Sequence, residues 1–157
     1  MNQTATLVEP YAELVAQARS LLDGQTHRIA NAANLSALIF NALERLNWVG
    51  FYFLEDGELI VGPFQGRPAC VRIAVGKGVC GTAVASRQTQ RVADVHAFEG
   101  HIACDPASRS ELVVPLIANG EVMGVLDIDS PEPGRFSAAD QQGFEALADV
   151  YLKSIGA

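Results

Sequence analysis

ELVVPLIANGEVMGVLDIDS, residues 111–130, is the stretch that decides the fold. Two runs rich in β-branched residues flank Asn119 and Gly120, and this pattern is typical of a β-hairpin. The register of a hairpin assigns every side chain to one face of the sheet, and the register depends on the number of residues in the turn. The stretch therefore predicts both a sheet and the composition of each of its faces.

Two turns fit this hairpin. A two-residue turn pairs Leu112 with Asp127 and mixes carboxylates with apolar side chains on both faces. A three-residue loop, in which a type I turn is followed by left-handed Gly120 in a bulge, pairs Glu111 with Asp127. We predict the second register because it separates the faces. One face then carries Leu112, Val114, Leu116, Val122, Leu126 and Ile128, and the other carries Glu111, Val113, Pro115, Met123, Val125, Asp127 and Asp129.

Three carboxylates meet at the polar end of this second face. Glu111, Asp127 and Asp129 would repel one another there, and neighbouring like charges raise the pKa of at least one carboxyl. A proton held near neutral pH is available for acid catalysis. The alternative is that Asp127 and Asp129 form only the solvated side of an edge strand.

Helical patterns lie on both sides of the sheet-forming region. Apolar residues recur three and four apart within residues 1–24 and again within residues 26–47, which predicts two amphipathic helices. A last helix is expected over residues 137–155, where Ser137 and Asp140 resemble a capping box.

Strand patterns occupy residues 47–131. A first hairpin turns at Asp56 and Gly57, further short strands follow, and a glycine turn leads into a short helix near Val79. Because hairpin connections imply antiparallel neighbours, we predict one α+β domain over residues 1–157, with helices packed on a mainly antiparallel sheet.

The charge of the chain excludes several partners. Its 11 Lys and Arg residues are scattered singly among 18 Asp and Glu residues, and the formal net charge is −7. Binding to nucleic acid or to an anionic membrane needs clustered cations, so we expect neither partner. The N-terminus lacks a secretory signal pattern, and no run is apolar enough to span a membrane. We therefore expect a cytoplasmic protein whose thiols are kept reduced.

Cys104 lies in a long polar connection, residues 96–110, where a structural thiol is unusual. A thiol with a pKa of about 8.5 is only slightly ionised at neutral pH and needs local help to act as a nucleophile. Asp105 and Pro106 resemble an N-cap and first helical position, and the amide end of such a turn would favour the thiolate. His101 is close in sequence, although a loop histidine is more often solvated or packed.

Cys70 and Cys80 each lie beside a turn, and for either alone a buried structural role is the better interpretation. A zinc site made from the three cysteines and His96 or His101 is an alternative. We predict no metal site, because nine and then twenty-three residues separate the cysteines and close C-x-x-C pairs are absent.

Five motifs occur in order along the chain: NWVGFYFL (47–54), GPFQGRPAC (62–70), GKGVCGTA (76–83), DVHAFEGHIACDPASRSELVVPL (94–116) and GVLDIDSP (124–131). Together they resemble the free methionine-(R)-sulfoxide reductases, enzymes built on a single GAF domain. The combination is specific, because generic GAF domains share the sheet but not the three cysteines with the HIACD and LDIDS motifs. The resemblance implies a six-stranded antiparallel sheet with helices on both faces and a closed pocket for the free amino acid.

The resemblance also implies a redox mechanism. Cys104 is expected to attack the sulfoxide sulfur, release methionine and become a sulfenic acid, which a second thiol condenses into a disulfide. By position, Cys70 is the expected resolving cysteine and Cys80 a second candidate. Thioredoxin, with thioredoxin reductase and NADPH, would restore the dithiol, so no bound cofactor is expected.

The same resemblance assigns the substrate contacts. Glu111, Asp127 and Asp129 are expected to hold the sulfoxide oxygen, and Trp48 and Tyr52 to cage the methyl group. Without the resemblance, an alternative is that the two aromatic residues are ordinary core residues. Backbone amides of residues 70–81 are candidates for holding the substrate carboxylate.

Two other functions compete with this one. A non-catalytic GAF sensor would bind a small molecule and signal to a partner domain, but no signalling helix follows before Ala157, so we expect the enzyme. A thiol peroxidase using Cys104 is disfavoured because the motifs of that class are absent. As partners we expect free methionine-(R)-sulfoxide and thioredoxin, and a homodimer is compatible with this interpretation.

Overall fold

A six-stranded antiparallel sheet forms the centre of the molecule. The computed structural model describes residues 6–102 and 104–157, and its strands lie in the order β3-β2-β1-β6-β5-β4. In chain order the elements are α1 (Tyr11–Leu22), α2 (Arg28–Ala42), β1 (Trp48–Glu55), β2 (Glu58–Gly66), β3 (Arg72–Ala74), α3 (Gly78–Ser86), β4 (Gln90–Val92), the 3-10 helix η1 (Val95–Ala97), β5 (Ser110–Ala118), β6 (Glu121–Ser130) and α4 (Ala138–Ser154).

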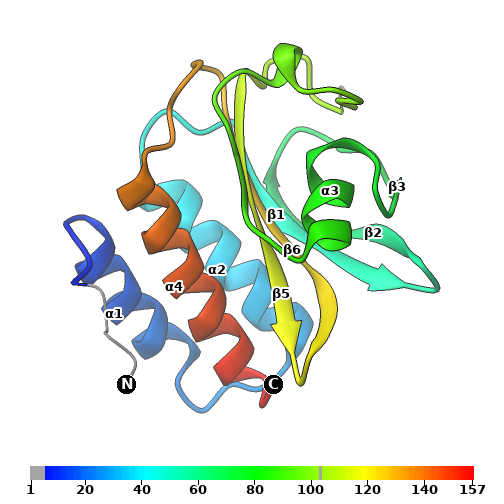
Figure 1. The fold of residues 1–157 in the computed structure, drawn as a ribbon. Coiled ribbons are helices and arrows are strands. Elements are labelled where there is room, and N and C mark those ends of the chain that lie inside the picture. The colour runs from blue at the N-terminus through cyan, green and yellow to red at the C-terminus, as the bar shows by residue number, and fades with distance from the viewer. Residues whose placement is uncertain (1–5, 103) are drawn as a thin grey trace.

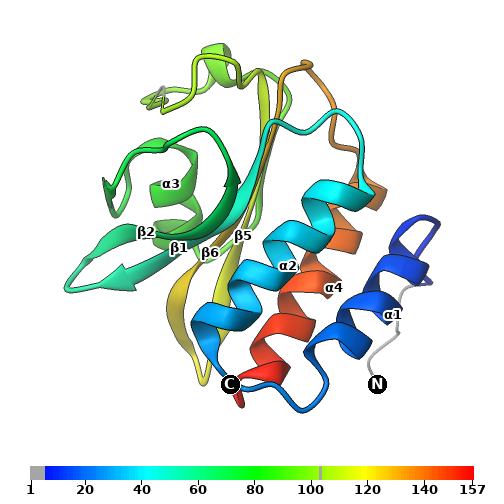
Figure 2. The same ribbon diagram turned by 180° about the vertical axis from the view of Figure 1, so that it is seen from behind.

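Helices cover both faces of the sheet. Helices α1, α2 and α4 lie together on one face, and α3 lies on the other with the long connection that follows β4 (Figure 1; Figure 2). The predicted α+β class, with six antiparallel strands and helices on both faces, is confirmed. No helix of the described residues is both long enough and apolar enough to cross a bilayer.

Two cores follow from this layering. The larger lies between the sheet and the three-helix layer and includes Phe51, Leu126 and Phe144, all fully buried. The smaller lies between the sheet and α3 and includes Trp48 and Cys80. The face toward the three helices is mainly apolar, whereas the face toward α3 also carries the carboxylates.

The start of α4 is capped as the sequence predicted. Ser137 Oγ accepts a hydrogen bond from the Asp140 amide at 3.2 Å, and Asp140 accepts one from the Ser137 amide at 2.7 Å, which completes a capping box. Asp140 also accepts a 2.6 Å hydrogen bond from the Tyr11 hydroxyl, which joins α1 to α4.

Helix α2 ends at Ala42, earlier than the apolar stripe over residues 26–47 suggests. Arg45 adopts a left-handed conformation with φ of 63°, which an α-helix does not accommodate. The chain then turns so that the Asn47 amide donates to the Asp129 carbonyl at 3.0 Å, and β1 begins beside β6. The last residues of the apolar stripe, 43–47, therefore connect α2 to β1 and are not helical.

The predicted three-residue hairpin loop is wrong. Asn119 and Gly120 form a two-residue turn between the paired residues Ala118 and Glu121. Their φ values are 52° and 78°, so both are left-handed, as a type I′ turn requires. Glu111 pairs with Asp129, not with Asp127, which instead lies opposite Val113.

A bulge explains why the carboxylates nevertheless share a face. The pairing steps from Leu116 with Gly124 to Ile117 with Val122, so Met123 is an extra residue on β6. With a two-residue turn alone, Glu111 and Asp127 would lie on opposite faces of the sheet. Because side chains alternate between faces, one extra residue in β6 returns Asp127 to the face of Glu111. Only the residues beside the bulge change sides: Met123 packs against the larger core and Val122 against the smaller, opposite to the prediction.

The connection before β5 does not form the predicted helical turn over residues 105–110. Asp105 accepts a 2.9 Å hydrogen bond from the Ala107 amide, and the Ser108 amide donates to the Asp105 carbonyl at 3.1 Å, so the segment is a single tight turn. The Arg109 amide already donates to the Ser130 carbonyl at 2.7 Å. Backbone pairing with β6 thus begins at Arg109, within the segment that was predicted to be a helical turn.

Candidate active site

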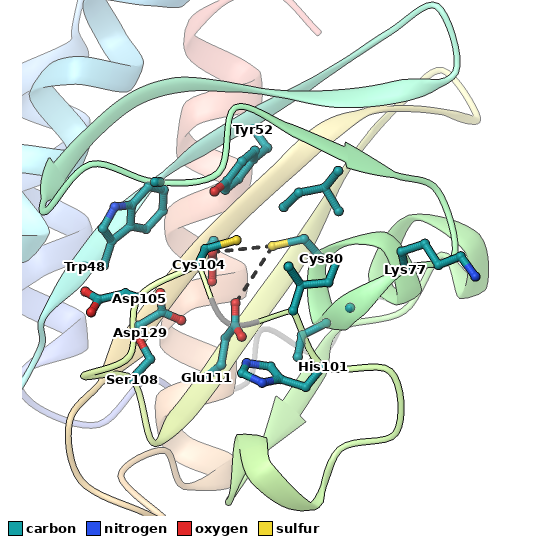
Figure 3. A pocket seen from close by; sticks show the side chains of 16 residues that line it. Trp48, Tyr52, Lys77, Cys80, His101, Cys104, Asp105, Ser108, Glu111 and Asp129 are labelled. Carbon is teal, nitrogen blue, oxygen red and sulfur yellow. Dashed lines mark hydrogen bonds between the residues drawn. The ribbon is translucent and has the colours of Figure 1, made fainter.

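A pocket lies between the sheet, α3 and the loop that carries Cys104. The cavity measures about 40 Å³, and Figure 3 shows side chains from β1, α3, β5, β6 and the loop converging on it. Its walls include most of the residues singled out from the sequence: Trp48, Tyr52, Cys80, Cys104, Glu111, Asp127 and Asp129. His101 also lines the pocket, whereas Cys70 lies outside it, bonded to Cys104.

Strand pairing brings the carboxylates together. Asp129 lies between Trp48 of β1 and Glu111 of β5, so these three side chains form one row across the sheet. Asp127 occupies the next row on the same face, opposite Gly50. Because Gly50 has no side chain, the Trp48 ring and Phe64 pack directly against its backbone, and a Cβ there would lie 2.8 Å from the Trp48 ring.

All three carboxylates are buried. Glu111 and Asp129 are each 8% exposed and Asp127 is 4% exposed. Burial raises the pKa of each carboxyl well above its usual range, and the charge of a neighbour adds to this: Asp127 acts on Glu111, Asp129 on Asp127, and Glu111 on Asp129. The cluster therefore retains protons at pH values at which exposed carboxyls are ionised.

The cluster also has free hydrogen-bonding capacity. Among the described residues, no lysine, arginine or histidine forms an ion pair with these carboxylates. Asp127 Oδ1 and Asp129 Oδ1 are buried without any hydrogen-bond partner. Since unpartnered buried oxygens are costly, the two atoms mark a place where a polar group of a ligand is accommodated.

Cys104 is joined to Cys70 by a disulfide. The sulfur atoms are 2.03 Å apart and the Cα atoms 5.3 Å apart, across 34 residues of sequence. Both residues are half-buried. The sulfur of Cys104 therefore lies within reach of two sites, the pocket that it lines and the second thiol beside it.

Cys80 is the free cysteine of the described chain, and it contacts the carboxylates directly. Its Sγ lies 3.4 Å from Asp127 Oδ2 and 3.9 Å from Glu111 Oε2, and dashed lines mark both contacts in Figure 3. Burial raises the pKa of the Cys80 thiol, and the charge of Asp127 raises it further. Cys80 thus remains a protonated thiol that donates to the cluster.

The start of α3 explains this contact, which the sequence did not predict. A Cβ on Gly81 would lie 2.5 Å from the Ala74 carbonyl oxygen, so only glycine lets the first turn of α3 approach the end of β3. The Gly76 amide donates to the Gly81 carbonyl at 2.8 Å and holds the turn there. The neighbouring Cys80 side chain is thereby directed toward β6.

Two aromatic side chains form another wall. The Trp48 and Tyr52 rings stack with centroids 5.7 Å apart and planes at 28°, and Phe64 also stacks with Trp48 at 5.1 Å. The Trp48 indole donates to the Arg67 carbonyl at 3.2 Å, which fixes the ring plane. Burial, with the charge of Asp127 next, raises the pKa of Tyr52, so its hydroxyl stays protonated. Both rings belong to the smaller core and line the pocket as well.

Asn47 holds the loop over the pocket. Its amide nitrogen donates to Asp105 Oδ2 and to Ser108 Oγ, at 3.0 Å each. Neither Asn47 nor Ser108 was predicted as part of the site. An asparagine directly before a strand and a serine in a polar loop are too common to indicate a contact between segments 61 residues apart.

Similar proteins are known. A family model described as "GAF domain" matches residues 30–151. The free methionine-R-sulfoxide reductase of Escherichia coli is 54% identical over 147 residues, covering 94% of this chain and 87% of that protein. The protein of the same name from Saccharomyces cerevisiae is 45% identical over 150 residues, covering 90% and 83%.

Solved structures extend the likeness to three dimensions. The fRMsr of Staphylococcus aureus, solved in complex with substrate, superposes with a TM-score of 0.90 at 51% identity. The alignment covers 96% of this chain and 99% of that one.

Proposed function

Because the chain belongs to the free methionine-R-sulfoxide reductases, a family within the GAF domains, we propose that it reduces free L-methionine-(R)-sulfoxide to L-methionine. One observation carries the proposal. Cys104 lines a pocket that is walled by three buried carboxyls, and its sulfur is bonded to a second cysteine. A nucleophile, an acid and a resolving thiol are the three groups that sulfoxide reduction by cysteine requires.

Cys104 is the nucleophile of the proposed reaction. In the reduced protein its thiolate attacks the sulfoxide sulfur while the oxygen takes up a proton. The oxygen is transferred to the cysteine sulfur, methionine leaves, and Cys104 becomes a sulfenic acid. The sulfur of the substrate is reduced by two electrons, and that of Cys104 is oxidised by two.

The carboxyl cluster supplies the proton. A sulfoxide oxygen becomes reactive when a proton is available to it, and the raised pKa of Glu111, Asp127 and Asp129 keeps one within the pocket at pH values at which exposed carboxyls are ionised. The unpartnered Oδ1 atoms of Asp127 and Asp129 are the candidates for holding the oxygen. No bound cofactor enters the proposed reaction.

Cys70 completes the cycle as the resolving residue. Its thiol displaces water from the Cys104 sulfenic acid and forms the disulfide. Cys80, the second candidate for this role, lies against Asp127 and has a raised thiol pKa, which disfavours nucleophilic attack. We therefore assign Cys80 a hydrogen-bonding role beside the acids.

The pocket walls fit the free amino acid. The stacked Trp48 and Tyr52 rings offer an apolar surface for the methyl group of the substrate. The cavity is small, about 40 Å³, and lies between the sheet, α3 and the loop, so we propose the free amino acid and not a protein-bound residue as the substrate. Backbone amides within residues 70–81 are proposed to hold its carboxylate.

Thioredoxin is the proposed reductant. Cys70 and Cys104 are only half-buried, so a protein thiol can approach their disulfide from outside. This recycling suits a reducing compartment such as the cytoplasm.

A coupled assay tests the proposal. The protein is incubated with free L-methionine-(R)-sulfoxide, thioredoxin, thioredoxin reductase and NADPH, and the loss of NADPH is followed. We expect steady loss that requires all four additions, and none with the (S) epimer. Silence with active reagents would instead favour the non-catalytic sensor.

A further inference from the structure

Cys80, Glu111 and Asp127 present three donor atoms to one point in the pocket. One ligand atom from each residue lies within 4.8 Å of the other two, and all three residues are buried. We call these residues the thiol–carboxylate trio. They come from α3, β5 and β6, so the sheet and the helix fix their separation.

No cationic side chain of the described residues is paired with the trio, although Lys77 and His101 line the same pocket. The Lys77 ammonium points away from the trio in Figure 3, and no ion pair within the described chain involves its carboxylates. Asp127 Oδ1 is buried with no hydrogen-bond partner, and so is Oδ1 of neighbouring Asp129. A cation is the ligand that satisfies buried, unpartnered carboxylate oxygens in a cluster without a counter-ion.

The distances suit zinc. Tetrahedral zinc has Zn–S bonds of about 2.3 Å and Zn–O bonds of about 2.0 Å, which place a sulfur and an oxygen ligand roughly 3.5 Å apart. The Cys80 Sγ lies 3.4 Å from Asp127 Oδ2 and 3.9 Å from Glu111 Oε2. One thiolate with two carboxylates also favours zinc over magnesium or calcium, which prefer oxygen ligands alone.

We propose that the thiol–carboxylate trio binds Zn²⁺ and that bound zinc excludes the substrate from the pocket. Zinc displaces the Cys80 proton and any proton that Glu111 and Asp127 hold, these protons pass to solvent, and no electrons are transferred. These ligands differ from the zinc site that the sequence offers as an alternative, which consists of the three cysteines with His96 or His101. Cys70 and Cys104 are bonded to each other here, so they take no part.

The exclusion of substrate rests on the proposed function. In that reaction the sulfoxide oxygen is held by the same carboxyls, so zinc and substrate cannot occupy the pocket together. The binding of zinc itself does not depend on the reaction.

Cobalt binding to the disulfide form tests the site. In this form Cys80 is the free thiol, so a cobalt–thiolate charge-transfer band in the ultraviolet reports on this residue alone. We expect the band to saturate at one Co²⁺ per chain and to disappear when Zn²⁺ is added. A protein that gives no band would overturn the proposal.

Matched variants identify the ligands. Cys80→Ser should remove the band, whereas Asp105→Asn, which changes another acid of the pocket wall outside the trio, should retain it. A band that persists in Cys80→Ser rules out the trio. Should circular dichroism show that Cys80→Ser is unfolded, Asp127→Asn decides the matter: Co²⁺ affinity should fall at least tenfold, and an unchanged affinity refutes the site.

A second measurement separates zinc binding from the reaction. Zn²⁺ should suppress methionine release by the reduced Cys70→Ser protein, and a chelator should restore it. Release that continues at saturating Zn²⁺ contradicts the exclusion of substrate. A protein that binds Co²⁺ through Cys80 but never releases methionine would refute the proposed function and leave the zinc site standing.

Discussion

Cys104 and Cys70 are proposed to divide two tasks that one thiol cannot perform. Cys104 lines the pocket and Cys70 lies outside it, joined to Cys104 by the disulfide. We expect reduced Cys104→Ser to release no methionine. Reduced Cys70→Ser should release one equivalent and then stop, because the sulfenic acid has no thiol to condense with. Quenching after mixing with substrate and counting methionine per chain measures both.

Cys80→Ser is the matched control for these two variants, since it also removes a single thiol of the pocket region. It should still form the disulfide and turn over repeatedly. Repeated turnover by Cys70→Ser, with none by Cys80→Ser, would transfer the resolving role to Cys80.

Asp127 is expected to act in the chemical step. Asp127→Asn keeps the shape of the side chain but cannot hold an acidic proton, so we expect methionine release to slow by roughly a hundredfold or more. The exposed Glu132, paired with Arg45 at the surface, provides an acid-to-amide control: Glu132→Gln should react at the normal rate. Near-normal release by Asp127→Asn would exclude this carboxyl from the reaction.

The same cluster should lower stability as pH rises. Burial raises the folded-state pKa of Asp129 above its unfolded value of about 3.9, so the folded state binds the proton more tightly. The resulting stability is present below the unfolded pKa and is lost as pH rises toward the folded pKa. Asp129→Asn escapes this loss and should melt higher than the wild type at pH 8, by about 2–4 °C for each kcal/mol recovered.

Thermal melting at several pH values tests the sign of this effect. The advantage of Asp129→Asn should shrink steadily between pH 8 and pH 4, whereas Glu132→Gln should differ little from the wild type throughout. An advantage that grows on acidification means that the folded-state pKa of Asp129 is not raised.

Residue types predicted part of the site, and packing added the rest. Three acids spaced along two strands were enough to predict a carboxyl cluster on one face, but spacing left open whether the cluster is buried or solvated. The contact between Cys80 and Asp127 depends on how closely α3 approaches β3, and no pattern along the chain records that approach. The Cys70–Cys104 pairing came from a family resemblance, because spacing alone leaves all three pairings open.

In the 111–130 hairpin, the sequence encodes which face of the sheet each side chain occupies better than it encodes which residues pair across the strands. Alternation predicted correctly that Glu111, Asp127 and Asp129 share one face, since burial selects faces. It did not predict the pairs, because a two-residue turn with a bulge at Met123 places these acids on the same face as a three-residue loop does. The turn is one residue shorter than predicted and the bulge adds one residue to β6, so the two differences cancel. The side chains beyond the bulge therefore lie on the predicted faces although the predicted loop is wrong.

Gly124 in β6 tests how tightly this sheet is built. A Cβ there would lie 2.1 Å from the Tyr52 carbonyl oxygen on β1, so the two strands would have to separate. We expect Gly124→Ala to lower the free energy of unfolding by roughly 2 kcal/mol or more. Urea denaturation measures this difference.

Gly120, at the turn of the same hairpin, is the matched control. Its φ is +78° and a Cβ would meet no atom within 4 Å, so Gly120→Ala should cost only the strain of a left-handed residue, about 1 kcal/mol. If both variants lower the free energy of unfolding by the same amount, β1 and β6 can separate at Gly124 at little cost, contrary to this prediction.

At the scale of the whole molecule, the sheet separates stability from chemistry. One face packs an apolar layer of three helices, and the other presents acids and a thiol to a pocket that α3 and the loop enclose (Figure 1). The α+β class and the order of the elements follow from hydrophobic period and turn residues. The enclosure of the pocket does not, because the loop is held by Asn47 contacts with Asp105 and Ser108 that join distant segments.

Stoichiometric reduction without any added reductant tests the central claim most directly. Fully reduced protein, freed of small thiols, is mixed with excess free L-methionine-(R)-sulfoxide, and both methionine and remaining thiols are counted. We expect one methionine per chain, the loss of two thiols, and a Cys70–Cys104 disulfide in the peptide map. No methionine, or methionine without loss of the Cys104 thiol, would contradict reduction through Cys104.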